Sequence, residues 1–251
     1  MKLFIGGNSH TPALKYGLDA LGQGAHEIHV GPFGTAAKVV KPFSAIRKGV
    51  VEFTLPEYAA NLERFTGKRH FDPADLWGIC MGTHFARIYR NPFWKEAAPA
   101  ALAGPGRRPA SRPASRPVSR AVLDAMIRND QRHVRALLSQ LKKTGVRFFV
   151  IECPPPRREW STREPCIPVD VLAAVDGAAR KQFRAWLARR DLPLVENPPE
   201  VVGPDGLLKD AYAKQVVLSD GQPDRLHANA EYGRLMMERI VAQIESMAAT
   251  A

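Results

Sequence analysis

The chain has 251 residues, of which 45% are hydrophobic and 24% charged, and 36 Lys and Arg against 25 Asp and Glu give a formal net charge of +11. This composition excludes wholesale disorder and is typical of a globular protein with a sizeable core. The N-terminus lacks a signal-peptide apolar region, and no stretch approaches about 18 consecutive apolar residues, so we expect a soluble, cytoplasmic protein with no membrane segment. The three cysteines lack CxxC spacing and fit a reducing compartment.

Strand-like and helix-like patterns alternate along the chain. In chain order they predict a strand at 3–5, a helix at 13–21, a strand at 27–30, a helix at 56–65, a strand at 75–81, a helix at 122–143, a strand at 146–153, a helix at 170–190, a short strand at 192–195 and a last helix capped by Asn229. This alternation favours one α/β domain over residues 1–251, built as a three-layer α/β/α sandwich with a mainly parallel sheet. Ligands of such sheets bind at the carboxyl ends of the strands.

Residues 97–120 differ in composition from the rest of the chain. They contain three tandem units, Arg-Pro-Ala-Ser, Arg-Pro-Ala-Ser and Arg-Pro-Val-Ser, which have little to bury and whose prolines forbid a regular helix. We expect a mobile, partly extended insertion. Residues 86–120 carry eight basic residues and one acidic residue, which is +7 of the +11. A weak contact with an anionic polymer through residues 107–120 is therefore one expectation.

Two short motifs could carry hydrolytic chemistry. Ser9 follows the first strand in a Gly-rich turn, where its backbone N–H could stabilise an oxyanion; the alternative is that Ser9 is only a helix N-cap. Asp224 precedes His227 by three positions and could accept the Nδ1 proton, which leaves Nε2 to act as a base; the alternative is a turn aspartate and a structural histidine. The coincidence of both motifs favours a Ser-His-Asp triad.

Gly7-Asn8-Ser9 and the Asp-x-x-His at 224–227 resemble the first and last blocks of the SGNH/GDSL hydrolase superfamily of esterases and lipases. Residues 75–85 and 145–155 are similar to its third block and its penultimate strand. The resemblance implies a flavodoxin-like SGNH hydrolase fold, with catalytic Ser9, Asp224 and His227. It also implies an oxyanion hole formed by Ser9, a glycine and His84. That glycine is Gly34 or Gly31, and Gly34 is preferred. Asn8 replaces the family's usual aspartate, and His84 replaces its usual asparagine.

The resulting hypothesis is a serine hydrolase that cleaves an acetyl or short acyl ester of a small molecule or carbohydrate. The alternatives are an O-acyltransferase of the same fold and a non-catalytic binding module that uses the basic insertion. No cofactor is expected, because the sequence contains no nucleotide-binding motif. No metal is expected, because His26 and His29 are separated by two residues on a predicted strand, where side chains alternate between the two faces, so the two rings do not converge on one ion. Trp94 and Trp160, which lie in predicted loops, are candidates for stacking on a sugar. Arg157 and Arg158 could contact an anionic substrate; the alternative, which is the more common case for loop arginines, is that both are solvated.

Overall fold

A five-stranded parallel sheet forms the centre of the protein. The structure, a computed structural model, describes residues 2–22, 26–35, 38–82, 88, 91–102, 116–162, 166–218 and 221–249. The strands of this sheet are β1 (Leu3–Gly7), β2 (Ile28–Pro32), β6 (Leu76–Cys80), β9 (Arg147–Ile151) and β10 (Leu194–Val195). They lie in the order β10-β9-β6-β1-β2, with Leu3 opposite both Ile28 and Leu76. This order is the flavodoxin-like one, and the predicted α/β class is confirmed.

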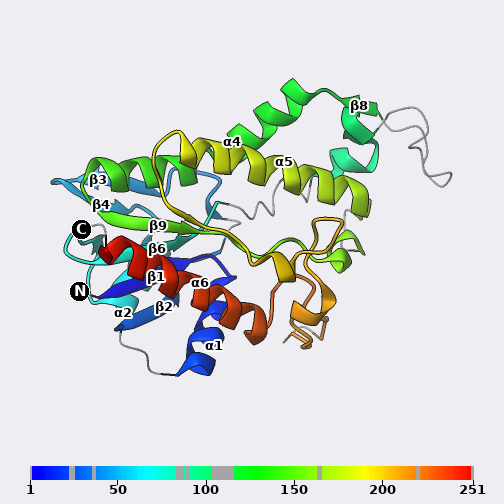
Figure 1. Ribbon diagram of the computed structural model, residues 1–251. Coiled ribbons are helices and arrows are strands. Elements are labelled where there is room, and N and C mark those ends of the chain that lie inside the picture. Colours follow the sequence, from blue (N-terminus) through cyan, green and yellow to red (C-terminus); the bar gives the residue numbers. More distant parts are fainter. Residues whose placement is uncertain are drawn as a thin grey trace.

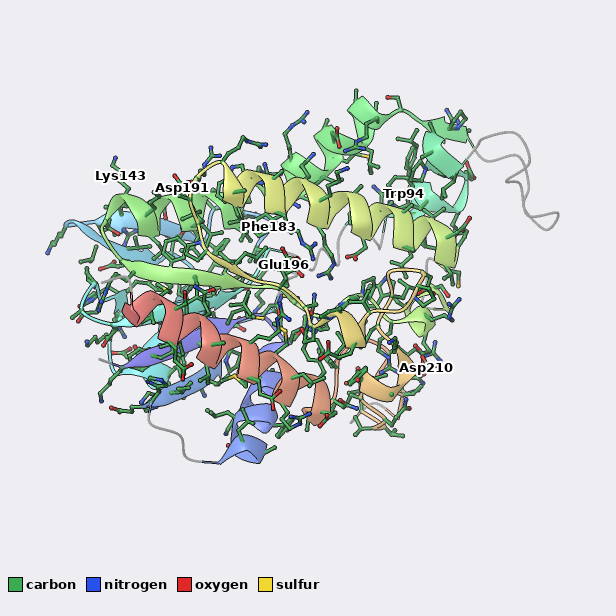
Figure 2. All side chains as sticks on the ribbon, viewed as in Figure 1. Trp94, Lys143, Phe183, Asp191, Glu196 and Asp210 are labelled. Atoms are coloured by element: carbon green, nitrogen blue, oxygen red, sulfur yellow. The ribbon has the colours of Figure 1, made fainter. Side chains whose placement is uncertain are left out.

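Helices cover both faces of this sheet (Figure 1). One face carries α1 (Thr11–Leu21) and α6 (Ala230–Ala249), and the other carries α2 (Pro56–Thr66), α4 (Arg120–Lys143) and α5 (Val169–Ala188). Successive residues of a strand point to opposite faces, so Leu3 and Ile5 join the core under α1 and α6, whereas Phe4 joins the core under α4 and α5. Figure 2 shows Phe183 of α5 between its helix and the sheet. The predicted three-layer arrangement is confirmed.

A small antiparallel sheet between β2 and β6 was not predicted. It consists of β3 (Ser44–Arg47), β4 (Val50–Phe53) and β5 (His70–Phe71). Lys48 and Gly49 join β3 to β4, and both have positive φ, as a two-residue hairpin turn requires. The strands are too short for their alternation to stand out in the sequence, and their aromatic side chains are buried by tertiary contacts with the main core.

The expectation of a mobile insertion over residues 97–120 is wrong at both ends of that segment. Strand β7 (Ala97–Pro99) pairs in parallel with β8 (Arg116–Val118), and Ala97, Ala98 and Val118 are buried. Ser119 then caps α4 by accepting a hydrogen bond from the backbone N–H of Val122 at 3.3 Å. The ends pack because a third apolar cluster, built largely on the N-terminal halves of α4 and α5, gives them a surface to cover. Residues 103–115, which hold most of the repeats, lie outside the described residues.

The same cluster accounts for both tryptophans proposed as sugar contacts. Trp94 and Trp160 are buried, at 1% and 4% exposure, so the stacking role is wrong. Figure 2 shows Trp94 beside the β7–β8 pair. The remaining short helices are the 3-10 turns η2 (Pro92–Lys95), η3 (Ala100–Leu102), η4 (Arg158–Thr162), η5 (Pro199–Val201) and η6 (Asp210–Tyr212). Among the described residues, every helix is too short or too polar to cross a membrane.

Helices α1 and α6 cross in unusually close contact. A Cβ atom added to Gly17 would lie 2.0 Å from the backbone carbon of Gly233, and one added to Gly233 would lie 1.8 Å from the carbonyl oxygen of Ala13. Only glycine permits this approach of two backbones. The crossing positions the functional site, because α1 begins just after Ser9 and α6 begins just after His227.

Candidate active site

The turn that carries Ser9 is held by its neighbours. The side-chain oxygen of Asn8 accepts the backbone N–H of His10 at 3.0 Å, and the carbonyl of Asn8 accepts the N–H of Thr11 at 3.2 Å. The N-cap of α1 is His10, whose side chain does not cap the helix, so Ser9 is not an N-cap. In the described part of the chain, neither the hydroxyl nor the backbone N–H of Ser9 has a hydrogen-bond partner, which leaves both groups available to a ligand.

A close backbone contact explains the glycine that directly precedes this turn, Gly7. A Cβ atom on Gly7 would lie 2.1 Å from the carbonyl oxygen of Cys80 at the end of β6. The carbonyl of Gly7 also accepts the N–H of Phe33 at 2.7 Å and that of Gly34 at 3.4 Å. The carboxyl ends of β1, β2 and β6 are thereby drawn together, and the segment after β2 lies beside the serine turn.

Asp224 and His227 form the pair expected from their spacing. Nδ1 of His227 lies 2.9 Å from Oδ2 and 3.1 Å from Oδ1 of Asp224. Oδ1 of Asp224 also accepts the backbone N–H groups of Leu226 at 3.0 Å and His227 at 3.1 Å, so the same carboxylate forms the turn and orients the ring. Nε2 of His227 is buried and has no hydrogen-bond partner among the described residues.

The charge state of Asp224 suits this arrangement. Its burial would by itself raise the pKa of the carboxyl, but the Leu226 N–H and the His227 imidazole outweigh that effect, and the pKa is lowered below its ordinary value. Asp224 is therefore ionised at neutral pH. An ionised carboxylate at Nδ1 keeps a proton on that nitrogen and leaves Nε2 to accept one.

Ser9 and the Asp224–His227 pair face one cavity of about 400 Å³. Its lining residues are Ser9, Pro12, Ala13, Tyr16, Pro32, Gly34, Thr35, Glu57, Asn61, Lys214, Leu218, Asp224, His227 and Ala228. They come from the turn before α1, α1 itself, the end of β2 and the segment after it, α2, and the loop before α6. The cavity thus lies at the carboxyl end of β1, where the chain order of the sheet predicts a ligand site.

The oxyanion-hole candidates differ in their placement. Gly34 lines the cavity, and its N–H makes the long contact with the Gly7 carbonyl described above. Gly31 belongs to β2, opposite Gly6 of β1, and is not one of the residues that line the cavity. His84 lies outside the described residues. The assignment of Gly34 and His84 to an oxyanion hole stays a prediction.

Arg157 was expected to be a solvated loop residue, and this expectation is wrong. The side chain is buried, with 3% exposure. Its Nη1 donates to the backbone carbonyls of Asp224 at 2.6 Å and Lys214 at 2.8 Å, and its Nη2 lies 3.2 Å from Glu159. Arg157 therefore ties the loop that presents Asp224 and His227 to the segment after β9. The burial depends on contacts 57 and 67 residues away along the chain, and no local pattern reveals it.

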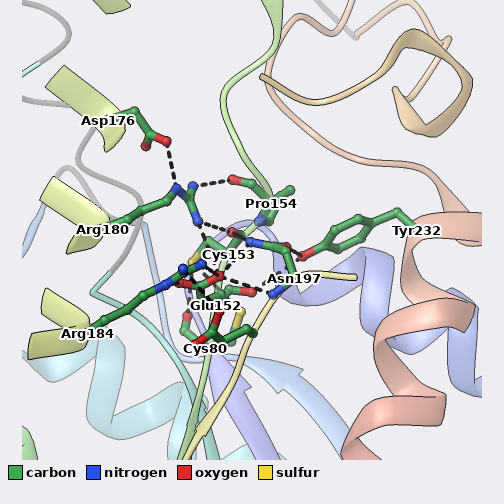
Figure 3. A network of polar contacts seen from close by, with 10 residues as sticks. Cys80, Glu152, Cys153, Pro154, Asp176, Arg180, Arg184, Asn197 and Tyr232 are labelled. Carbon is green, nitrogen blue, oxygen red and sulfur yellow. Dashed lines mark hydrogen bonds and ion pairs between the residues drawn. The ribbon is translucent and has the colours of Figure 1, made fainter. Parts of the chain in front are cut away.

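A buried polar network supports the same segment (Figure 3). Glu152, with 0% exposure, accepts hydrogen bonds from Arg184 at 2.7 and 2.9 Å and from the Asn197 side chain at 3.0 Å. Arg180 donates to the carbonyls of Cys153 and Pro154, both at 2.9 Å. These bonds hold the chain where it leaves β9, a few residues before Arg157.

Side chains suited to metal binding do not gather in the described regions. There, no group of three or more His, Cys, Asp or Glu residues could hold an ion. His29 instead contacts Glu27 at 3.0 Å. The thiols of Cys80 and Cys153 lie 3.8 Å apart behind the serine turn, and none of the three cysteines forms a disulfide.

Comparison with known proteins gives similarity in structure and not in sequence. No family model and no curated protein sequence matches the chain. A candidate acylhydrolase from Bacteroides fragilis is 13% identical, with 98% of this chain and 87% of that one covered, at a TM-score of 0.50.

Two further solved structures have similar descriptions. A GDSL-like lipase from Bacteroides thetaiotaomicron is 13% identical, covers 98% of this chain and 88% of its own, and has a TM-score of 0.49. An aryl esterase from M. smegmatis is 14% identical, covers 98% of this chain and 99% of its own, and has a TM-score of 0.46. At such identities the likeness concerns the fold, and the chemistry has to come from this chain's own residues.

Proposed function

We propose that this chain, which has the fold of the SGNH/GDSL hydrolase superfamily, is a serine ester hydrolase that removes an acetyl or other short acyl group from a small molecule or carbohydrate. One observation carries the proposal. His227 is oriented by ionised Asp224 at Nδ1, while its buried Nε2 has no partner among the described residues and lines the same cavity as Ser9. A base so held and a hydroxyl facing the same space are what acyl transfer to serine requires.

The reaction then proceeds in two halves. Nε2 of His227 takes the proton of Ser9 as the hydroxyl oxygen attacks the ester carbonyl, and it returns that proton to the alcohol as the carbon–oxygen bond breaks. In the second half, the same nitrogen takes a proton from water as the water oxygen attacks the acyl carbon. It then returns that proton to the Ser9 oxygen as the bond between this oxygen and the acyl carbon breaks and the acid leaves. The Ser9 N–H donates to the oxyanion, with Gly34 and His84 as the further donors in this proposal.

The size and lining of the cavity support a small substrate. A volume of about 400 Å³ is near the lower end of ordinary ligand pockets, which span about 300–1,000 Å³. Pro12, Ala13, Pro32 and Ala228 contribute small apolar surfaces near the reacting groups. Such walls suit a short acyl group and leave little room for a long chain.

The proposal is tested with a fluorophosphonate probe and para-nitrophenyl acetate, applied to the wild type, Ser9→Ala and His227→Ala. Labelling is expected in the wild type and lost in Ser9→Ala, and kcat is expected to fall by about 10⁴-fold or more in each variant. Ser139→Ala is the matched control, because Ser139 is exposed on α4 and outside the cavity. A wild type that neither labels nor turns over the ester would contradict the enzyme and favour a binding module.

A further inference from the structure

Lys214 brings a positive charge to the wall of the cavity. Its side chain lines the cavity, and its Nζ lies 5.9 Å from the centre of the Tyr16 ring. Among the residues that the structure describes, no carboxylate forms an ion pair with Lys214. The backbone of Lys214 is fixed, since its N–H donates to the His227 carbonyl at 2.9 Å and its carbonyl accepts from Arg157 at 2.8 Å. The ammonium is therefore placed at the cavity by the same loop that presents the catalytic base.

The acidic groups that line the cavity already have partners. Glu57 forms an ion pair with Lys38. Asp224 is buried, at 2% exposure, and its oxygens accept hydrogen bonds from the backbone N–H groups of Leu226 and His227 and lie against Nδ1 of His227. Lys214 is therefore the charged group in the described wall of the cavity that has no such partner among the described residues. A cation beside mostly apolar walls binds a ligand with one negative charge most favourably.

The wall between Ser9 and this charge follows one face of α1. Ser9, Pro12, Ala13 and Tyr16 recur at helical spacing and all line the cavity. Tyr16 lies about two turns beyond Ser9, and the Nζ of Lys214 is beside its ring. Between these two points the wall is formed by the apolar side chains of Pro12 and Ala13.

From these observations we infer that the cavity takes short-chain acyl esters whose alcohol part carries a carboxylate, with an apolar spacer between the ester and the carboxylate. Lys214 binds the carboxylate, Tyr16 supports the ammonium with its ring, and Pro12 and Ala13 contact the spacer. One ammonium matches the single charge of a carboxylate. This inference rests on the proposed function for the reaction and adds the substrate class.

The test compares charged and neutral esters of equal length. The series consists of acetate esters of straight-chain hydroxy acids of increasing length, each with its neutral methyl ester. The kcat/KM for release of acetate is expected to favour the carboxylate over its methyl ester, with a maximum at one chain length.

Variants of Lys214 show whether the preference comes from its charge. Lys214→Met is expected to lower the ratio of kcat/KM for the carboxylate to that for the methyl ester by about tenfold, as for loss of a charge-assisted contact. Lys214→Arg should retain most of the preference. The matched control is Lys15→Met, which removes the same charge from α1 next to Tyr16 but outside the cavity. The preference should also weaken with rising salt concentration.

The outcomes separate this inference from the proposed function. Equal losses on charged and neutral esters in Lys214→Met, or no preference of the wild type for the carboxylate, would overturn the inference while the hydrolase remains. If the wild type hydrolyses none of the esters, the proposed function fails, and a binding measurement tests the inference instead. Calorimetry with the corresponding N-acetyl amino acids, which are the amide analogues of these esters, should then show weaker binding to Lys214→Met than to the wild type and Lys15→Met, and equal binding would overturn the inference.

Discussion

Asp224 serves two purposes with one carboxylate. Its oxygens accept the backbone N–H groups that close the turn, and they also hold the Nδ1 side of His227. The spacing of three residues makes this possible, because a turn brings the imidazole back over the side chain that forms the turn. Local sequence therefore determines the orientation of the His227 ring, whereas Ser9, which lines the same cavity, comes from the opposite end of the chain.

At this scale we predict the effect of Asp224→Asn. Asparagine retains the acceptor for the turn but loses the negative charge that stabilises the protonated ring, and its amide can stabilise the wrong tautomer of His227. We expect kcat to fall by about 10⁴-fold with little change in KM. Steady-state kinetics with para-nitrophenyl acetate measures both values.

Asp205→Asn is the matched control for that substitution. Asp205 accepts the backbone N–H of Leu207 in the same two-residue pattern, but it does not line the cavity. Its substitution should leave kcat near that of the wild type. Retention of more than about a tenth of the activity in Asp224→Asn would show that His227 does not depend on this carboxylate, contrary to the triad chemistry.

At the scale of elements, the crossing of α1 and α6 brings the two halves of the site together. Ser9 and His227 are 218 positions apart in the chain, and each lies just before one of these helices. The two helices meet at Gly17 and Gly233, where their backbones are too close for any other side chain. The distance between Ser9 and His227 thus depends on a packing contact about two turns away from either of them.

We therefore predict that Gly17→Ala and Gly233→Ala each lower both stability and activity. The added methyl group must push the helices apart, which costs about 1–3 kcal/mol in free energy of unfolding. The same movement displaces Ser9 from His227 and should lower kcat by about 10²-fold. Urea unfolding and steady-state kinetics measure the two effects.

Gly177→Ala is the control for helix propensity. Gly177 lies in α5, and a Cβ atom there would meet nothing within 4 Å. This substitution should stabilise the protein by about 0.5–1 kcal/mol and leave kcat unchanged. If Gly17→Ala behaves like Gly177→Ala, the close crossing does not set the geometry of the site.

At the scale of the whole molecule, Glu152 connects both helical layers through the sheet. It follows β9 directly, accepts from Arg184 of α5, and contacts Asn197, whose side chain accepts the hydroxyl of Tyr232 of α6 at 2.7 Å. Burial alone would raise the pKa of Glu152, but the two arginines, Arg184 and Arg180, outweigh it and the pKa is lowered. Folding thus stabilises the ionised form of this carboxyl.

The sign of the resulting pH dependence follows from that shift. A carboxyl whose pKa is lower in the folded protein contributes stability above its unfolded value, which for Glu152 is near the ordinary 4.5, and loses it as the pH falls through the folded value. We predict that Glu152→Gln lowers the free energy of unfolding at pH 7 by about 3–5 kcal/mol, because Arg184 and Arg180 lose a buried partner. The difference from the wild type should shrink as the pH falls below 4.5.

Glu196→Gln controls for the loss of a surface ion pair. Glu196 also pairs with Arg184, at 3.0 Å, but its side chain is 47% exposed, and Figure 2 labels it near the end of β10. Its substitution should change the free energy of unfolding by less than about 1 kcal/mol. A Glu152→Gln difference that stays constant from pH 7 to below 4.5 would contradict the role of its ionised form.

Periodic patterns were sufficient to predict the central sheet and its helices. The strand after Val146 and the helix capped by Asn229 appear with small shifts in their ends, and Asn229 caps α6 through the N–H of Tyr232 at 3.0 Å. The hairpin at Lys48-Gly49 was missed because four-residue strands give little periodicity. The packing of residues 97–102 and 116–120 was missed because burial there depends on a surface offered by distant helices.

The sequence by itself determined the α/β alternation, the turn around Ser9 and the Asp224–His227 pair, because each depends on residues only a few positions apart. Only the tertiary structure decided that Arg157 is buried, that α1 and α6 cross at Gly17 and Gly233, and that the charge of Lys214 faces the cavity unpaired among the described residues. Each of these depends on contacts between segments far apart in the chain. Their free energy comes from burial and close approach in the folded state, which no local pattern of side chains encodes.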